Sequence, residues 1–224
     1  MEARHIRRGD PDFPHALKAS GGFLAIEFID VLGNISILQG KMLGLLCSVK
    51  CPGGIVLKTF DTARALRDAG VTVIGGFHSP MEKECLDLLL RGKQAVVVCP
   101  ARSIQNMRLP AAWRKPIAEG RLLLLSPFDA KVRRVSRSSA GQRNALVVSM
   151  ADGLLVPHAA SGGDVEAICR QAAGIEKEIY TLNTSVNRFL SAQGAQMFDL
   201  SQWVGPIGRN ANLSVCREGS VTDS

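Results

Sequence analysis

The sequence predicts an α/β protein with a Rossmann-like, doubly wound, mainly parallel sheet and helices on both faces. The first observation is that short apolar runs alternate with segments of helical periodicity from residue 43 onwards. The second is that these runs are apolar throughout, which is typical of strands covered by helices on both sides. We expect the following six runs to be strands: 43–49, 71–76, 95–100, 121–128, 153–159 and 177–183.

Four helices are predicted between these strands. In residues 55–70, apolar side chains recur at a spacing near 3.6 residues, and Gly70 ends the pattern. The next helix begins with Ser79 as N-cap and Pro80 at the first helical position. The stretches 139–151 and 162–174 are expected to form the other two helices.

The length of 224 residues fits one domain with a substantial core. We expect residues 1–40 to be an N-terminal extension or cap, 41–206 to be the Rossmann-like domain, and 207–224 to be a flexible tail. No apolar run approaches the roughly 20 residues of a membrane span, and the first residues show no signal-peptide pattern. These features predict a cytoplasmic protein that does not enter a membrane.

The six cysteines are scattered, without a C-x-x-C pair or a Cys/His cluster at zinc spacing. We therefore expect neither a disulfide nor a bound metal. The dinucleotide fingerprint G-x-G-x-x-G and the Walker A motif are also missing after the first predicted strand. No cofactor is predicted.

The net charge of +7 is concentrated in one part of the chain. Residues 102–143 contain ten Lys and Arg but only two Asp and Glu, so they account for all of this excess. Clustered cations favour a phosphate-bearing partner such as nucleic acid, because binding releases its counterions. A solvated basic face is the alternative interpretation.

Small residues recur at the predicted strand ends, where α/β sheets bind their ligands. The pairs Gly53–Gly54, Gly75–Gly76 and Gly162–Gly163 would let backbone N–H groups approach a phosphate at a helix N-terminus. Together with neighbouring polar and basic side chains, these glycine pairs predict a phosphate-binding site. We expect no catalytic residue. The site comprises Ser48, Lys50, Gly75, Gly76, His78, Arg133, Arg134, Arg137, Arg143, Asn144, Ser161, Gly162 and Gly163.

Each of these residues also has a simpler interpretation. The glycines would serve tight turns, Arg143 would pair with a nearby carboxylate, and Ser161 would cap a helix. His78 and His158 would be structural hydrogen-bonding groups. Aromatic residues are scarce, so the bases of a single strand could stack on few candidates, namely Phe77, Trp113 and Phe128.

Several motifs resemble the DprA/Smf family of DNA-processing proteins. Arg143-Asn144 aligns with the Arg-Asn signature of that family, followed by a helix, an apolar strand and a Ser-Gly pair. The turn at Gly75 and Gly76 aligns with the family's small-residue turn, and 186–195 resembles the end of its domain. Where the family has Gly-Ser-Arg, "LLCSVK" keeps Ser48 and departs from the pattern at Cys47 and Val49, with Lys50 as the nearest cation.

The resemblance runs from about residue 13 to residue 199 and implies a function. It implies a non-catalytic protein that binds single-stranded DNA through a basic pocket and helps to load a RecA-type recombinase in recombination and transformation. A homodimer is a further expectation.

Two alternatives stay open from the residues themselves. One is a sensor domain that binds a small nucleotide without turnover. The other is a nucleoside monophosphate phosphoribohydrolase of the lysine-decarboxylase-like (LOG) family. The P-G-G-x-G-T-x-x-E motif of that family is only partly matched by "SGGDVEA", in which Glu166 falls too early.

Overall fold

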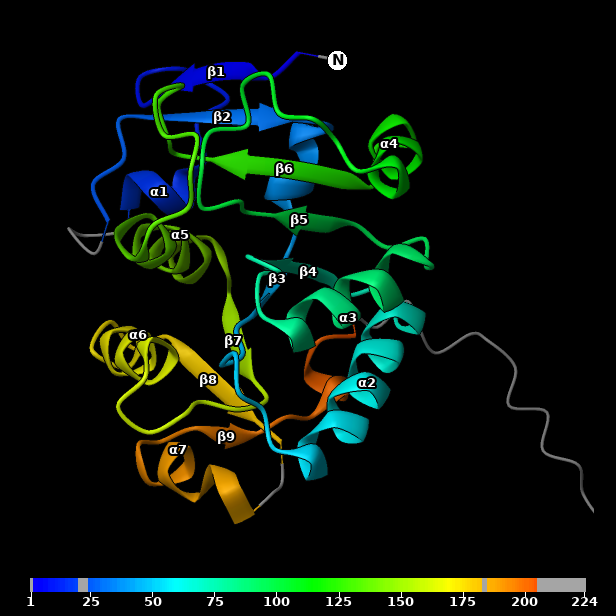
Figure 1. The fold of residues 1–224 in the computed structure, drawn as a ribbon, viewed down its shortest axis with the longest axis vertical. Coiled ribbons are helices and arrows are strands. Elements are labelled where there is room, and N and C mark those ends of the chain that lie inside the picture. The colour runs from blue at the N-terminus through cyan, green and yellow to red at the C-terminus, as the bar shows by residue number, and fades with distance from the viewer. Residues whose placement is uncertain (1, 20–23, 183–184, 205–224) are drawn as a thin grey trace, which may run out of the picture.

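The computed structural model describes residues 2–19, 24–182 and 185–204 (Figure 1). Its described part contains one nine-stranded sheet. The strands are Arg4–Arg7 (β1), Phe28–Leu32 (β2), Met42–Leu45 (β3), Thr72–Gly75 (β4), Val96–Val98 (β5), Leu122–Ser126 (β6), Gly153–Val156 (β7), Glu178–Thr181 (β8) and Gln196–Met197 (β9). Their spatial order is β1-β2-β6-β5-β4-β3-β7-β8-β9.

The sheet is mainly parallel, as predicted. All pairings from β6 across to β9 are parallel, whereas β1 with β2 and β2 with β6 are antiparallel. The chain proceeds from β3 to β6 in one direction and then returns to β7 on the other side of β3. In open α/β sheets, ligands bind at such a reversal of strand order, which here lies at the carboxyl ends of β3 and β7.

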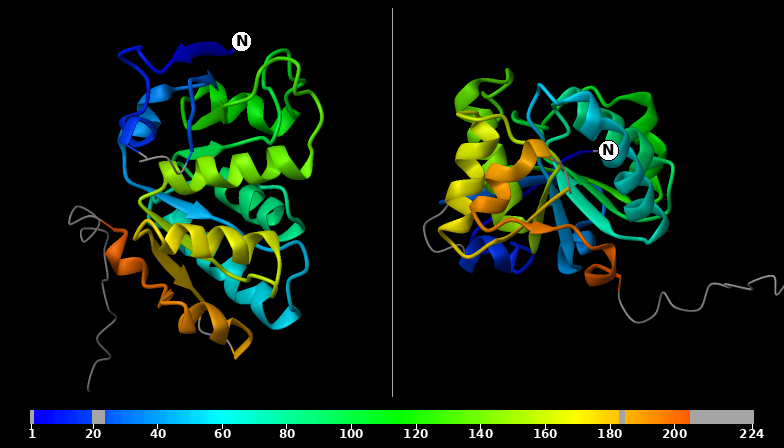
Figure 2. Two further views of the ribbon diagram at one scale, coloured as in Figure 1. Left: turned by 90° about the vertical axis from the view of Figure 1, so that its left-hand side faces the viewer. Right: turned by 90° about the horizontal axis from the view of Figure 1, so that it is seen from below.

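Helices cover both faces of the sheet (Figure 2). Gly53–Asp68 (α2), Pro80–Leu90 (α3) and Ala111–Ala118 (α4) pack on one face. His15–Ala19 (α1), Arg137–Met150 (α5), Asp164–Ala173 (α6) and Arg188–Ala192 (α7) pack on the other. Short 3-10 turns occupy Ile35–Gln39, Ser185–Asn187 and Leu200–Gln202.

The N-terminal segment 1–40, expected to be an extension or cap, contributes β1 and β2 to the same sheet. Asp30, Val31 and Leu32 of β2 pair with Ser126, Leu125 and Leu124 of β6. The tail predicted for 207–224 lies outside the described residues. Within the described chain, no helix is long and apolar enough to cross a membrane.

Two helix starts illustrate how local sequence sets the boundaries. Ser79 caps α3 as predicted, with Pro80 at the first helical position. Helix α5 begins at Arg137, two residues before the predicted start, because Ser136 caps it: its Oγ accepts the N–H of Ser139 at 3.1 Å. Arg143 and Asn144 therefore lie in the second turn of a helix and not in a loop.

The core is closely packed where α5 crosses the central strand. Gly44 in β3 has no side chain, and a Cβ at this position would lie only 2.6 Å from Cδ2 of Leu154 and 3.0 Å from Cβ of Ala151. Val147 of α5 also faces this glycine. The close approach fixes the helix against the sheet and thereby places Arg143, one turn earlier, above the strand ends.

Candidate functional site

Three adjoining pockets lie along the carboxyl edge of the sheet. The β3 pocket, of ≈ 300 Å³, is bordered by the segments after β3, β4 and β7. The β5 pocket, of ≈ 480 Å³, lies between α3, α4 and the segment after β5. Arg143 and His78 line both of these pockets. A third, the loop pocket of ≈ 270 Å³, shares Arg102, Met107 and Arg108 with the β5 pocket.

Arg143 is the central side chain of this edge. It is only 6% exposed, and its Nε donates a 2.8 Å hydrogen bond to Oδ1 of Asn144. Among the described residues it forms no ion pair, and Nη1 and Nη2 have no hydrogen-bond partner. Burial lowers the pKa of this guanidinium, and the nearby charge of Glu82 opposes that effect. Four N–H donors of a buried cation are thus left without a protein partner.

Gly76 provides the space that Arg143 occupies. A Cβ at residue 76 would overlap with the guanidinium and lie 2.6 Å from its Nε. Any larger residue would push this side chain out of its position. The predicted glycine turn after β4 therefore accommodates the arginine, which in turn faces the pockets.

Glu82 organises the loops around the arginine. Its buried carboxylate accepts the N–H of Cys47 through Oε1 at 2.8 Å. Its Oε2 accepts the N–H groups of His78 at 2.8 Å and Ser79 at 3.3 Å. Burial raises the pKa of Glu82, while these backbone bonds and the charge of Arg143 lower it. Our sequence prediction missed this residue, although the S-x-x-E spacing of Ser79 and Glu82 is a capping-box signal.

Ser48 joins the segment after β3 to the segment after β7. Its N–H donates to the carbonyl oxygen of His158 at 3.0 Å, and its Oγ accepts the N–H of Ala160 at 2.8 Å. His158 is buried, with Nδ1 3.4 Å from Oδ1 of Asn187. Lys50 is exposed at the rim of the β3 pocket. Ser48 thus holds together two of the segments that border the β3 pocket. Lys50 adds a solvent-exposed cation to that pocket.

The turn after β7 differs from the turn after β4. Gly163, and not Ser161, is the N-cap of α6, and no side chain caps it. The carboxylate of Glu166 accepts the N–H of Gly162 and also pairs with Arg170. Carboxylates therefore already occupy the surroundings of this helix N-terminus.

Three arginines of the predicted site lie outside the β3 and β5 pockets. Arg137 is exposed and pairs with Asp164, with Nη2 2.7 Å from Oδ1. Arg133 lines the loop pocket, and Arg134 is exposed on the same segment.

The β3 pocket gathers six predicted residues: Ser48, Lys50, His78, Arg143, Asn144 and Gly163. The β5 pocket contains Gly76 with His78 and Arg143. Gly75 ends β4, and its carbonyl oxygen accepts the N–H of Cys99 at 2.8 Å.

The β5 pocket also contains residues that the site prediction missed. Arg102 and Arg108 belong to the basic segment, and Trp113 was considered only for stacking. The other stacking candidates, Phe77 and Phe128, are buried at 5% and 4% exposure. Only the folded chain shows that Arg102, Arg108 and Trp113 border the same pocket.

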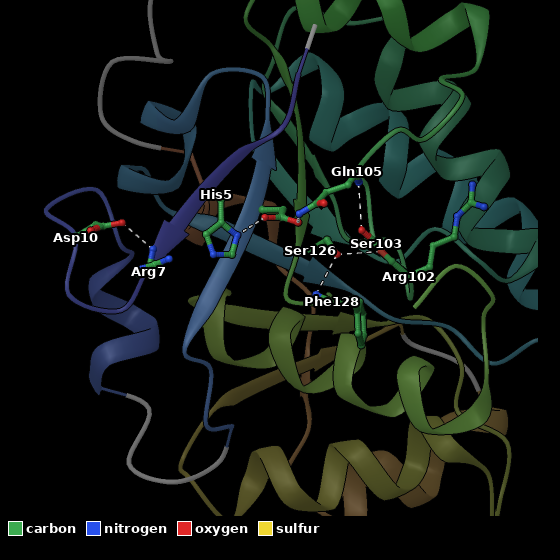
Figure 3. A network of polar contacts seen from close by, with 9 residues as sticks. His5, Arg7, Asp10, Arg102, Ser103, Gln105, Ser126 and Phe128 are labelled. Atoms are coloured by element: carbon green, nitrogen blue, oxygen red, sulfur yellow. Dashed lines mark hydrogen bonds and ion pairs between the residues drawn. The ribbon is translucent and has the colours of Figure 1, made fainter. Parts of the chain in front are cut away.

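A polar network holds the segment that carries Arg102 and Arg108 (Figure 3). The fully buried carboxylate of Asp30 on β2 is 2.8 Å from Nδ1 of His5 and accepts a 2.8 Å bond from Nε2 of Gln105. Oγ of Ser126 donates to the carbonyl oxygen of Arg102 at 2.9 Å. The guanidinium of Arg102 points away from this network. The N-terminal strands thereby support one wall of the β5 pocket.

No group of three or more His, Cys, Asp or Glu residues in the described part of the chain could hold a metal ion. The five cysteines in that part are free thiols. Burial raises the pKa of Cys85, Cys99 and Cys169 to about 12, which keeps them protonated and poorly nucleophilic.

Comparisons with known proteins agree with this architecture. The chain is similar in fold to DNA processing protein A from Streptococcus pneumoniae, with a TM-score of 0.73 and 13% identity, over 88% of this chain and 71% of that one. It is also similar to DNA processing protein A from Helicobacter pylori, with a TM-score of 0.70 and 16% identity, over 91% of this chain and 96% of that one. The Helicobacter pylori protein has a unique single-stranded DNA binding mode.

A comparison with curated proteins found no match. The family model described as DNA recombination-mediator protein A matches residues 4–200, which is most of the sequence. This chain therefore belongs to the DNA recombination-mediator protein A family, a family of DNA-processing proteins.

Proposed function

We propose that this protein binds single-stranded DNA without catalysing a reaction, and that Arg143 contacts a backbone phosphate at the β3 pocket. The observation that carries this proposal is a buried guanidinium with four unpartnered N–H donors facing two pockets. A phosphate would accept such donors in the bidentate geometry that arginine favours. Its charge would also compensate the buried cation.

The surroundings of Arg143 support a polyanion as the ligand. Lys50 stands at the rim of the β3 pocket, while Arg102 and Arg108 line the adjoining β5 pocket. Arg133 continues this arrangement into the loop pocket. Cations spread over three connected pockets suit several successive phosphates better than a single one.

The environment of Glu166 argues against the phosphoribohydrolase alternative. The residue is only 4% exposed, and its carboxylate is engaged by the N–H of Gly162 and by the guanidinium of Arg170. These contacts indicate that the carboxylate of Glu166 has a structural role at the start of α6. The experiments below also distinguish a small nucleotide from a single strand as the natural ligand.

The direct test is a titration of a fluorescently labelled thymidine oligomer with the protein, followed by anisotropy at several salt concentrations. We expect tight binding at low salt that weakens steeply, with roughly 0.7 in the log–log slope for each phosphate contacted. R143A should lower the affinity and reduce the slope by about 0.7, which is the contribution of one phosphate contact. R64A removes an exposed arginine on α2 that pairs with Asp61, and it should leave both unchanged.

Two results would contradict the proposal. One is the lack of binding by the wild-type protein at low salt. The other is an equal loss of affinity in R143A and R64A, since this would mean that the strand binds through general surface charge. The RecA-type recombinase and the homodimer stay predictions, which the family membership motivates.

A further inference from the structure

The β5 pocket contains more than the phosphate contacts require. Its floor is apolar, with Phe77, Leu86 and Val98 among the lining residues. Trp113 of α4 lines the same pocket and is half-buried. A solvent-accessible apolar pocket beside a set of cations suits a ligand that is both flat and negatively charged.

The three arginines of this pocket are each shared with a neighbouring pocket, whereas Lys83 and Asp87 of α3 line the β5 pocket alone. Arg143 belongs also to the β3 pocket, whereas Arg102 and Arg108 belong also to the loop pocket. The apolar part therefore adjoins two groups of arginines, one shared with each neighbouring pocket. In a single strand, each base is likewise attached between two successive phosphates.

We propose that the β5 pocket receives one unstacked base of the bound strand, with Trp113 as the stacking surface. Arg143 binds the phosphate on one side of this nucleotide, and Arg102 with Arg108 bind the phosphate on the other. The inference rests on the proposed function and adds to it a base subsite and a path from the β3 pocket to the loop pocket. Stacking on an aromatic ring tolerates every base, so the subsite confers no strong sequence preference.

Val135 supports this assignment. It is 48% exposed although it is apolar, and it lines the β5 pocket together with Trp113 and Met107. A base between these side chains would remove their apolar surface from water. The same segment carries Arg133 and Arg134, so the strand would cover both the apolar and the basic part of it.

The test compares two labelled strands of eight nucleotides, one of thymidine and one with an abasic backbone of the same charge. We expect the wild-type protein to bind the thymidine strand about tenfold more tightly, and W113A to lose this difference while binding the abasic strand unchanged. W113F keeps an aromatic ring and should retain most of the preference. F189A on α7, at the opposite end of the sheet, is the matched control and should bind as wild type.

A second readout uses tryptophan fluorescence, because the sequence contains only Trp113 and Trp203. In W203F, emission comes from Trp113 alone, and we expect the thymidine strand but not the abasic strand to quench it. Equal binding of both strands by wild type and W113A would overturn the base subsite and leave the proposed function intact. If the wild-type protein bound neither strand, both proposals would be overturned.

Thymidine 5′-monophosphate serves as a third ligand. We expect it to quench Trp113 only at concentrations far above those of the strand, because it offers a single phosphate. Tighter quenching by the mononucleotide than by the strand would overturn the assignment to a strand and identify a free nucleotide as the ligand.

Discussion

The turns after β4 and β7 both contain a pair of glycines at the carboxyl edge of the sheet, yet they present different chemistry. At Gly76 the missing side chain makes room for the guanidinium of Arg143, which has no ion pair among the described residues. At Gly162 the backbone N–H is bound by Glu166, and Asp164 pairs with Arg137. The first turn leaves a cation free for a ligand, whereas in the second the N–H of Gly162 and the nearby Arg137 are already bound by carboxylates.

This difference shows that neither glycine content nor charge density predicts which turn leaves a cation without an ion pair. Arg137 and Arg143 lie on the same helix, but one is exposed and paired and the other is buried and unpaired. An exposed ion pair contributes little in either direction. A buried guanidinium with free N–H donors and no ion pair gains far more from an anion, so the contrast between the two turns can be tested by single substitutions.

The largest effect is expected for G76A. The added methyl group displaces Arg143, and the loss of charge-assisted hydrogen bonds should weaken single-strand binding by about 1.5–3 kcal/mol, with little change in stability. Anisotropy titration and thermal melting measure the two quantities. G141A is the matched control, because Gly141 is exposed on α5 with no atom within 4 Å of the added group, and it should bind normally.

The next effect is expected for E82Q. The amide keeps one acceptor oxygen but replaces the other with a donor, so at least one of the N–H groups of Cys47, His78 and Ser79 loses its partner. An unsatisfied buried group of this kind should lower the free energy of unfolding by about 1–3 kcal/mol in urea titrations. Unchanged stability would mean that the carboxylate does not hold the two loops together.

G162A should affect stability and not binding. Gly162 has a φ of +71°, so a side chain would cost about 1 kcal/mol or more of folding free energy. Because this turn has no unpartnered cation of its own, the affinity for a single strand should stay at the wild-type value. The pair G76A and G162A would then separate the two turns by opposite phenotypes. Weaker binding in G162A at constant stability would argue that the second turn also contacts DNA.

The smallest effect is expected for D164N. It releases Arg137 from its exposed ion pair and removes a negative charge near the β3 pocket. We expect a gain in affinity of about twofold at low salt that disappears as salt rises, since surface charges are screened. D61N, which frees Arg64 on α2 in the same way, is the control and should not change binding.

Much of the fold was predictable because each central strand is a continuous apolar run and each main helix has a visible cap or periodicity. The strand of residues 4–7 was not identified, since this edge strand has one buried position only. The strand of residues 28–32 was missed because the buried Asp30 interrupts its apolar run. Helix α4 was missed because it is short and contains Pro116. These errors concern elements whose stability comes from tertiary contacts and not from local pattern.

The candidate site was predictable in composition but not in arrangement. Arg143 and Gly76 were both named from the sequence, yet their direct packing against each other depends on α5 crossing the sheet. The pairing of Arg137 with Asp164 joins residues 27 positions apart and could not be read from charge counts. The role of Glu82 was readable from the capping box, although its third contact, to Cys47, required the fold.

The guanidinium of Arg143, which forms no ion pair among the described residues, also couples ligand occupancy to the stability of the whole domain. Removing most of this side chain from water costs folding free energy, and an anion that binds only the folded state offsets that cost by mass action. At a ligand concentration of 100 times the dissociation constant, this linkage amounts to about 2.7 kcal/mol. The empty protein is thus expected to unfold and to be degraded more readily than the protein on DNA, so that its abundance would follow the supply of single strands.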